Sequence, residues 1–188
     1  MTDLHLPRLD KNLLHIMVDI ETTSVSPNAG IWQIGACVFN EDHVGYFFHT
    51  LNVYAIDNDK YHWDRNTIEW QIQHNSTEWN VANEIPNDTT MWEFLERFSK
   101  WILEQKKNFN KSKLAIWSKG SYFDIPILEN AFKTENISLP WRYNEIYDAR
   151  TIFNLTGHVM PRFDGAHNAL NDARHQAAEL EKVFRELF

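Results

Sequence analysis

The most informative stretch of this chain is LLHIMVDIETT, residues 13–23, where a hydrophobic run ends at two acidic residues. The aliphatic run from Leu13 to Ile20 predicts a buried β-strand. Because successive side chains of a strand alternate between its two faces, Asp19 and Glu21 share one face and lie about 7 Å apart along it. Two carboxylates in this arrangement can bind one hard cation or a pair. The alternative is that these acids only mark the exposed end of the strand.

Besides this first strand, four more segments have the hydrophobic pattern that is typical of β-strands. They are Ile31 to Asn40, Val44 to Leu51, Leu114 to Trp117 and Glu145 to Asp148. The first two are joined by a polar turn at Glu41 and Asp42, which predicts an antiparallel meander with the opening strand.

Helical segments alternate with the later strands. Short helices are expected at Asn66 to Asn75 and Ser76 to Asn83, and Thr90 with Glu93 forms a capping box that opens a longer one. Another helix is expected after Asp124. The inward faces of the two long helices are Met91, Phe94, Leu95, Phe98, Trp101 and Ile102 in the first, and Leu170, Ala173, Ala177, Leu180, Phe184 and Leu187 in the last. This order predicts an α/β fold, a mixed sheet flanked by helices.

Two more acidic residues stand where helices are expected to begin. Asp124, within YFDIPIL (residues 122–128), lies at a strand-to-helix transition, where an N-cap is the alternative role. Asp172 lies in the first turns of the last helix, and His167 precedes it within HNALNDA (residues 167–173). The alternative for this pair is an acid that complements the helix dipole beside a surface histidine.

Taken together, the four acids and the histidine predict metal-dependent phosphodiester cleavage. Two divalent ions beside an anionic substrate need several carboxylates, as oxygen ligands and as compensating charge. The reaction also benefits from a group that takes a proton from the attacking water near neutral pH, and histidine is the usual choice.

Three motifs resemble those of a known family. DIETT (residues 19–23), SYFDIPIL (121–128) and HNALNDA (167–173) are similar to motifs of the DEDDh branch of the DnaQ-like 3′–5′ exonucleases, which includes polymerase proofreading subunits, RNase T and oligoribonuclease. Within this branch, TIEWQIQHNSTEW (67–79) and PWRYNEIYDART (140–151) look most like phage and prophage exonucleases and their bacterial exoribonuclease relatives. The similarity extends from about Leu14 to the C-terminus.

The resemblance implies an RNase H-like fold with a five-stranded sheet, in a single exonuclease domain over residues 1–188 with its core from about residue 13. It implies that Asp19, Glu21, Asp124 and Asp172 bind two Mg²⁺ or Mn²⁺ ions and that His167 is the general base. The expected reaction is hydrolysis from the 3′ end of single-stranded DNA or RNA, releasing nucleoside 5′-monophosphates. The family is often dimeric, so a homodimer is an expectation of the same kind.

The resemblance also suggests residues around the terminal nucleotide. Thr22 and Thr23 are expected to border it. Tyr122 and Phe123 are candidates for base stacking, although burial in a core is the commoner role of aromatic side chains.

Composition limits how the chain can hold nucleic acid. Its net charge of −8 argues against a broad basic binding surface. Two divalent ions at the four carboxylates would reduce this to about −4. Six lysines lie between Lys100 and Lys119 with one acid, Glu104, and either a solvated helix end or a substrate-facing rim fits them. Asp148 and Arg150 either form an ion pair or contact phosphate.

Targeting features are lacking in the sequence. The single Cys37 excludes an internal disulfide and fits a reducing compartment. Met1 to Asn12 has neither a long apolar run nor a cleavage-like site, and no stretch approaches 18 apolar residues. A cytoplasmic protein without membrane association is therefore expected.

Three other functions are compatible with parts of the sequence. A catalytically inactive binding module would have lost a metal-binding acid or His167, and all are present. An RNase H-type endonuclease does not need the HxAxxDA motif, although a related fold hosts both chemistries. A hydrolase of small phosphodiesters would act on dinucleotides and not on longer strands.

Overall fold

The computed structural model describes residues 9–40 and 45–186. A five-stranded sheet forms its centre, with the strands in the order β3-β2-β1-β4-β5. Their bounds are β1 (Leu13–Thr22), β2 (Ile31–Phe39), β3 (Tyr46–Thr50), β4 (Lys113–Ser118) and β5 (Ile146–Asp148). The first three strands pair antiparallel. β4 pairs parallel with β1, and β5 pairs parallel with β4. The prediction of a mixed five-stranded sheet is confirmed, and the arrangement is consistent with an RNase H-like fold.

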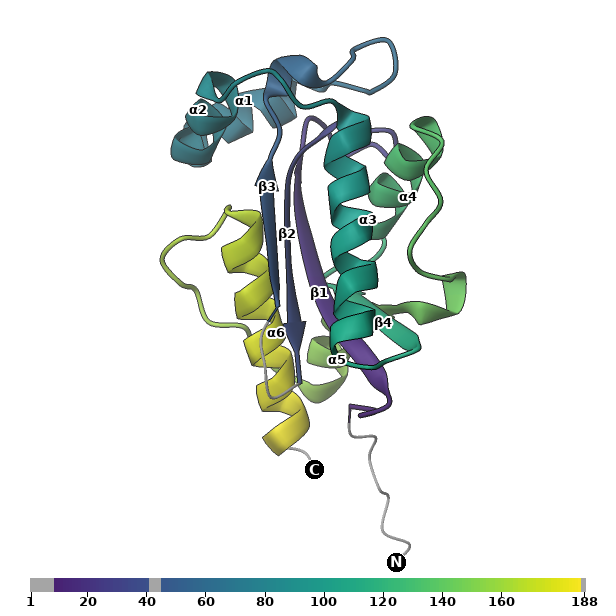
Figure 1. The fold of residues 1–188 in the computed structure, drawn as a ribbon. Helices are drawn as coiled ribbons and strands as arrows, with labels where there is room; N and C mark the ends of the chain where they lie inside the picture. Colours follow the sequence, from purple (N-terminus) through teal and green to yellow (C-terminus); the bar gives the residue numbers. More distant parts are fainter. Residues whose placement is uncertain (1–8, 41–44, 187–188) are drawn as a thin grey trace, which may run out of the picture.

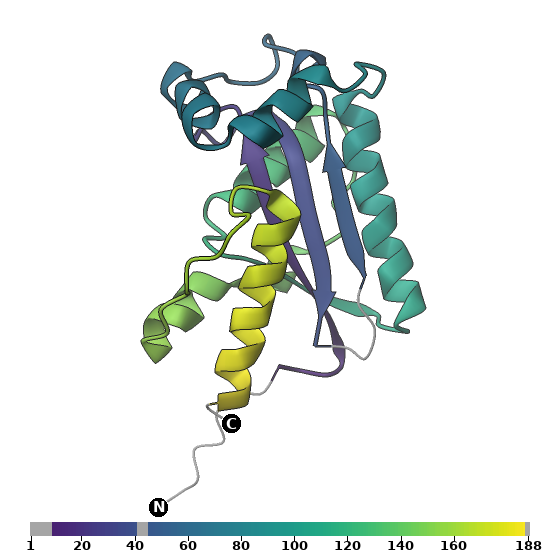
Figure 2. The ribbon, with the colours of Figure 1, turned by 90° about the vertical axis from the view of Figure 1, so that its left-hand side faces the viewer.

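Helices cover both faces of this sheet (Figure 1, Figure 2). They are α1 (Arg65–His74), α2 (Ser76–Glu84), α3 (Met91–Asn108), α4 (Asp124–Thr134), α5 (Ala149–Thr156) and α6 (Ala169–Glu186), with short 3₁₀ turns at Val53–Ala55 and Tyr143–Glu145. α3 and α4 lie on one face and α6 lies on the other, while α1 and α2 lie beyond the end of β1. The predicted capping box of Thr90 and Glu93 is present at the start of α3.

One helix, α5, was not expected. It has only eight residues, too few for hydrophobic periodicity to reveal it. Its start is fixed by Asp148, whose side chain accepts a hydrogen bond from the backbone N–H of Thr151. Gly157, in the left-handed conformation with φ of 69°, ends it.

The alternation of side chains along β1 divides them between two cores. Ile16 and Val18 pack in the larger core with Phe98 of α3. Met17 packs in the smaller core with Ala173 of α6. Asp19 and Glu21 continue the odd-numbered row, so the two carboxylates lie on the α6 side where β1 ends.

Small residues let the start of α6 lie close to the sheet. A Cβ atom at Gly35 of β2 would collide with the backbone of Ala169 and Leu170, so only glycine fits there. The backbone N–H of Ala169, one of the first of α6, donates to the buried Gln33 Oε1 at 2.8 Å. These contacts fix the position of the acid that α6 carries one turn later.

Some expectations lie outside the described residues. These are the turn at Glu41 and Asp42, the start of a strand at Val44, the inward place of Leu187, and most of the stretch from Met1 to Asn12. In the described part of the chain, no helix combines the length and apolar character needed to cross a membrane.

Candidate active site

Three carboxylates meet where β1 ends beside the first turn of α6. Asp19 and Glu21 come from β1, and Asp172 comes from α6. Each offers one oxygen atom, and these three atoms lie within 4.8 Å of one another. Such a spacing is compatible with shared coordination of a divalent cation.

A fourth carboxylate, that of Asp124, comes from the start of α4. The structure shows that its alternative role as an N-cap is wrong. Phe123 occupies the N-cap position without a side-chain cap bond, and Asp124 is the first helical residue. Its side chain is buried, and its charge acts on Asp19. The carboxylate therefore faces the acids of β1 rather than capping its own helix.

His167 precedes α6 and is tied to Asp172. Its backbone N–H donates to Asp172 Oδ2 at 2.6 Å. Its φ is 68°, a left-handed conformation that costs a non-glycine residue roughly 1 to 3 kcal/mol. The indole of Trp70 in α1 packs edge-to-face on the imidazole, with the ring centroids 4.8 Å apart. The backbone of His167 is thus anchored by Asp172, and its ring packs on Trp70.

All five predicted catalytic side chains line one cavity of about 280 Å³. The full lining is Asp19, Ile20, Glu21, Lys119, Phe123, Asp124, Arg150, His167, Asp172 and Gln176. The sequence motifs that lie far apart along the chain therefore converge in space.

Burial and mutual repulsion favour the protonated forms of these acids in the metal-free chain. Removal from water raises the pKa of Asp19 well above its ordinary value, and the charges of Asp124, Glu21 and Asp172 raise it further. Burial raises the pKa of Glu21 to about 8 and that of Asp124 to about 7. The pKa of Asp172 is raised by burial as well, and the hydrogen bond from His167 opposes that shift.

Two glutamines hold the β1 acids, and sequence reasoning missed both. Gln71 Nε2 of α1 donates to Glu21 Oε2 at 2.9 Å, and Gln176 Nε2 of α6 donates to Asp19 Oδ1 at 2.8 Å. Gln176 follows Asp172 by four residues, so helical periodicity places both on one face and was a usable signal. No comparable signal links Gln71 to Glu21, because the contact spans 50 positions.

The chemistry of the donor set fits divalent metal. Four carboxylates in one cavity are mutually repulsive, and a divalent cation is the simplest compensation. Gln176 Oε1 is buried and has no hydrogen-bond partner within the described residues, which leaves an acceptor beside Asp19. Oxygen-rich sites of this kind suit Mg²⁺ or Mn²⁺ rather than softer metals.

Comparison with known families shows which family the chain belongs to. A profile described as Rv2179c-like, 3′-5′ exoribonuclease Rv2179c-like domain, matches residues 14–184. The chain belongs to this family. It is therefore a member of a 3′–5′ exonuclease family, as the motifs predicted. No curated protein matches the chain significantly.

The other predicted site residues of this family member fall in different places. Thr22 and Phe123 line a second cavity of about 450 Å³ that adjoins the acids. Thr23 is fully buried, its hydroxyl donates to the backbone carbonyl of His62 at 2.8 Å, and it lines neither cavity. Tyr122 is 96% exposed and lines neither cavity.

Two basic side chains stand at the rim of the acidic cavity. Lys119 and Arg150 both line it, and an Arg150 N–H donates to the carbonyl oxygen of Lys119 at 3.1 Å. Asp148 accepts from Ser121 Oγ and caps α5, so of the two alternatives for Asp148 and Arg150 the ion pair is not observed among the described residues. Of the lysine-rich segment, Lys119 alone lines this cavity, whereas Lys100 pairs with Glu96.

Proposed function

We propose that this protein is a 3′–5′ exonuclease that removes nucleotides one at a time from the 3′ end of single-stranded RNA. The observation that carries the proposal is the convergence of four carboxylates and one histidine on a single cavity in a member of this family. The family description favours RNA over DNA. The expected products are nucleoside 5′-monophosphates.

In this proposal, Asp19, Glu21, Asp124 and Asp172 hold two Mg²⁺ or Mn²⁺ ions. When bound, the ions polarise the scissile phosphate and offset the charge of the leaving 3′ oxygen. Gln71 and Gln176 orient the β1 carboxylates through their amide donors, as partners of metal ligands commonly do.

His167 accepts the proton of the attacking water. Its ring lines the cavity that holds the acids, and its backbone is anchored to Asp172. Trp70 packs on the ring and limits its rotation. A base placed in this way is held near its target without being a metal ligand itself.

The adjoining cavity is suited to the terminal nucleoside. It is bordered by Thr22, Val25, Trp70 and Phe123 among others, and it shares Ile20, Glu21 and Phe123 with the acidic cavity. Aromatic walls provide stacking surfaces for a base. Lys119 and Arg150, which line the acidic cavity but not the adjoining one, supply positive charge for the scissile or the next phosphate.

The direction of degradation tests this function. With a 5′-labelled single-stranded RNA and Mg²⁺, we expect a ladder of labelled products that shortens with time, because nucleotides leave from the unlabelled 3′ end. Chromatography of an unlabelled reaction should yield nucleoside 5′-monophosphates. A matched single-stranded DNA in parallel measures the preference for RNA.

The same assay separates an exonuclease from an endonuclease. A circular RNA has no 3′ end, and it should remain intact under conditions that degrade its linear counterpart. Fragments released from the circle would contradict the proposal and favour an RNase H-type endonuclease.

We also predict that single strands are degraded faster than blunt duplexes of the same sequence. With a net charge of −8, the chain lacks the excess of basic residues that holding an opened duplex requires. Initial rates on matched single-stranded, 3′-overhang and blunt substrates measure this. Equal rates on the blunt duplex and the single strand would overturn the preference.

A further inference from the structure

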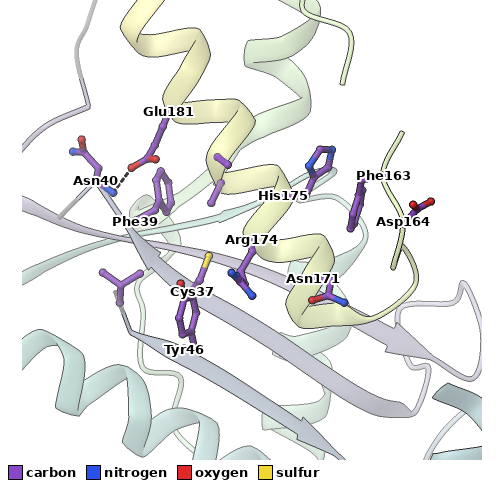
Figure 3. A pocket seen from close by; sticks show the side chains of 13 residues that line it. Cys37, Phe39, Asn40, Tyr46, Phe163, Asp164, Asn171, Arg174, His175 and Glu181 are labelled. Atoms are coloured by element: carbon purple, nitrogen blue, oxygen red, sulfur yellow. Dashed lines mark hydrogen bonds between the residues drawn. The ribbon is translucent and has the colours of Figure 1, made fainter. Parts of the chain in front are cut away.

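A third hollow runs along α6 (Figure 3). It has a volume of about 530 Å³ and is bordered by α6, the end of β2, the start of β3 and the loop that precedes α6. We name it the α6 groove and define it by Tyr46, Phe163, Asp164, Asn171, Arg174 and His175. It shares no residue with the acidic cavity.

The α6 groove contains two pairs of aromatic and nitrogen-bearing side chains. The guanidinium of Arg174 lies over the Tyr46 ring, 5.0 Å from its centroid. The rings of Phe163 and His175 lie 4.2 Å apart between centroids, at an interplanar angle of 31°. Figure 3 shows Arg174 directed toward Tyr46, with His175 and Phe163 facing each other.

Both members of the first pair, Tyr46 and Arg174, can still contact a ligand. Tyr46 is 45% exposed, so part of its ring faces solvent. Arg174 is exposed and, within residues 9–40 and 45–186, its guanidinium makes neither a hydrogen bond nor an ion pair. A partly exposed aromatic ring beside an arginine that has no hydrogen-bond or ion-pair partner is a combination by which proteins hold single-stranded nucleic acid, with bases on rings and phosphate on the cation.

The loop before α6 joins the groove to the active site. It carries Phe163 into the groove and His167 into the acidic cavity. His175 Nε2 contacts the Pro161 carbonyl oxygen at 2.9 Å, and Asn171 Nδ2 donates to the Gly165 carbonyl oxygen at 3.3 Å. These two contacts hold the loop against α6, and the loop contributes residues to both the α6 groove and the acidic cavity.

The two sites are close enough for one strand. Asn171 lines the groove, and the next residue, Asp172, lines the acidic cavity. Their separation is therefore on the order of one helix diameter, about 10 Å. A strand whose 3′ end lies at the acids can cross the start of α6 within a few nucleotides.

We propose that the α6 groove binds the segment of single-stranded RNA that lies 5′ of the scissile bond; the identity of the strand rests on the proposed function. Bases stack on Tyr46 and Phe163, and Arg174 donates to a backbone phosphate. Glu181, at one end of the groove, already accepts a hydrogen bond from the backbone N–H of Asn40 at 2.6 Å. Asp164 repels phosphate, which places the backbone at the Arg174 side.

The test compares substrate length in full-length variants Arg174→Gln and Tyr46→Leu. For the wild type, kcat/KM should rise as single-stranded RNA is lengthened from about two to about twelve nucleotides, because a longer strand reaches the groove. The variants should match the wild type on the dinucleotide and fall about tenfold below it on the longest strand. Lys182→Gln, an exposed charge on the same helix, and Tyr54→Leu, an exposed tyrosine elsewhere, are matched controls.

A readout without catalysis separates this proposal from the proposed function. RNA carrying photoreactive bases is irradiated with the protein in EDTA, and the cross-linked peptides are mapped. Cross-links at Tyr46 or Phe163 that disappear in Arg174→Gln support the groove even if no exonuclease activity is found. The proposal is overturned if the wild type is active, its groove variants behave like Lys182→Gln at every length, and the cross-links lie elsewhere.

Discussion

Removing divalent metal should abolish the nuclease activity, and Mg²⁺ or Mn²⁺ should restore it. The four carboxylates repel one another and the substrate phosphate unless cations compensate their charge. Metal ions stabilise the transition state by several kcal/mol, and each 1.4 kcal/mol is tenfold in rate, so the loss should be at least about a thousandfold. Rates in excess EDTA, before and after adding metal back, measure it. Undiminished turnover in EDTA would rule out the two-metal proposal.

Single substitutions of the ligands should reproduce this loss. Asp19→Ala or Asp172→Ala should lower the rate by several orders of magnitude while the protein stays folded, because each removes oxygen ligands without emptying the core. Asp88→Asn, an exposed acid remote from the cavity, is the control for a change of charge. A ligand variant that keeps more than about a tenth of the rate would remove that residue from the metal site.

Metal binding should also be visible in thermal stability. Burial raises the pKa of Glu21 from 4.5 to about 8, so the folded metal-free protein retains a proton that the unfolded chain has lost. The contribution of this proton to the free energy of unfolding is fully present below pH 4.5. It decreases as the pH rises and is lost once the pH passes about 8, where the folded protein must also ionise Glu21. Metal relieves this loss, so the rise in Tm on adding Mn²⁺ should grow between pH 6 and pH 8. A Tm unaffected by metal across this range would count against the site independently of activity.

The fold could be predicted from sequence where patterns are long. The strand that ends at Asp19 and Glu21 and the two long helices are strongly patterned. The strand lies within two residues of its expected bounds, and both helices begin within one residue of their expected starts. The short helix after Asp148 was missed because its signal is a single capping side chain. Sequence also gave no sign that Gly35 lets α6 approach the sheet, since that contact joins residues more than 130 positions apart.

The part of the candidate site that lies in sequence motifs could be predicted. The acids and His167 stand in recognisable motifs, and the structure brings them to one cavity. Gln71 and Trp70 were missed because their roles depend on where α1 packs, which no local pattern encodes. Thr23 stands in the same motif as Asp19, yet it is buried because the chain turns after β1 and uses its hydroxyl internally. A motif thus identifies the residues, and only packing decides which of them reach the cavity.

Replacing His167 should lower kcat far more than it weakens binding. His167→Ala removes the group proposed to take the proton from the attacking water, and a loss of roughly 10² to 10⁴ is the usual scale for a general base. Because a general base acts only in its unprotonated form, the wild-type rate should fall toward acidic pH, and the variant should lose that part of the dependence. Single-turnover cleavage at saturating enzyme and metal, from pH 6 to pH 9, measures both effects.

The backbone at His167 calls for a second variant. Its φ of 68° strains alanine, so part of the loss in His167→Ala could arise from a shifted loop. Asparagine tolerates the left-handed conformation and keeps the backbone N–H that anchors Asp172, but it has no imidazole. A similar loss in His167→Asn, with unchanged Mn²⁺ binding, assigns the effect to proton transfer. If His167→Asn stays within about threefold of the wild type with the same pH dependence, the histidine only shapes the loop, and another base takes the proton.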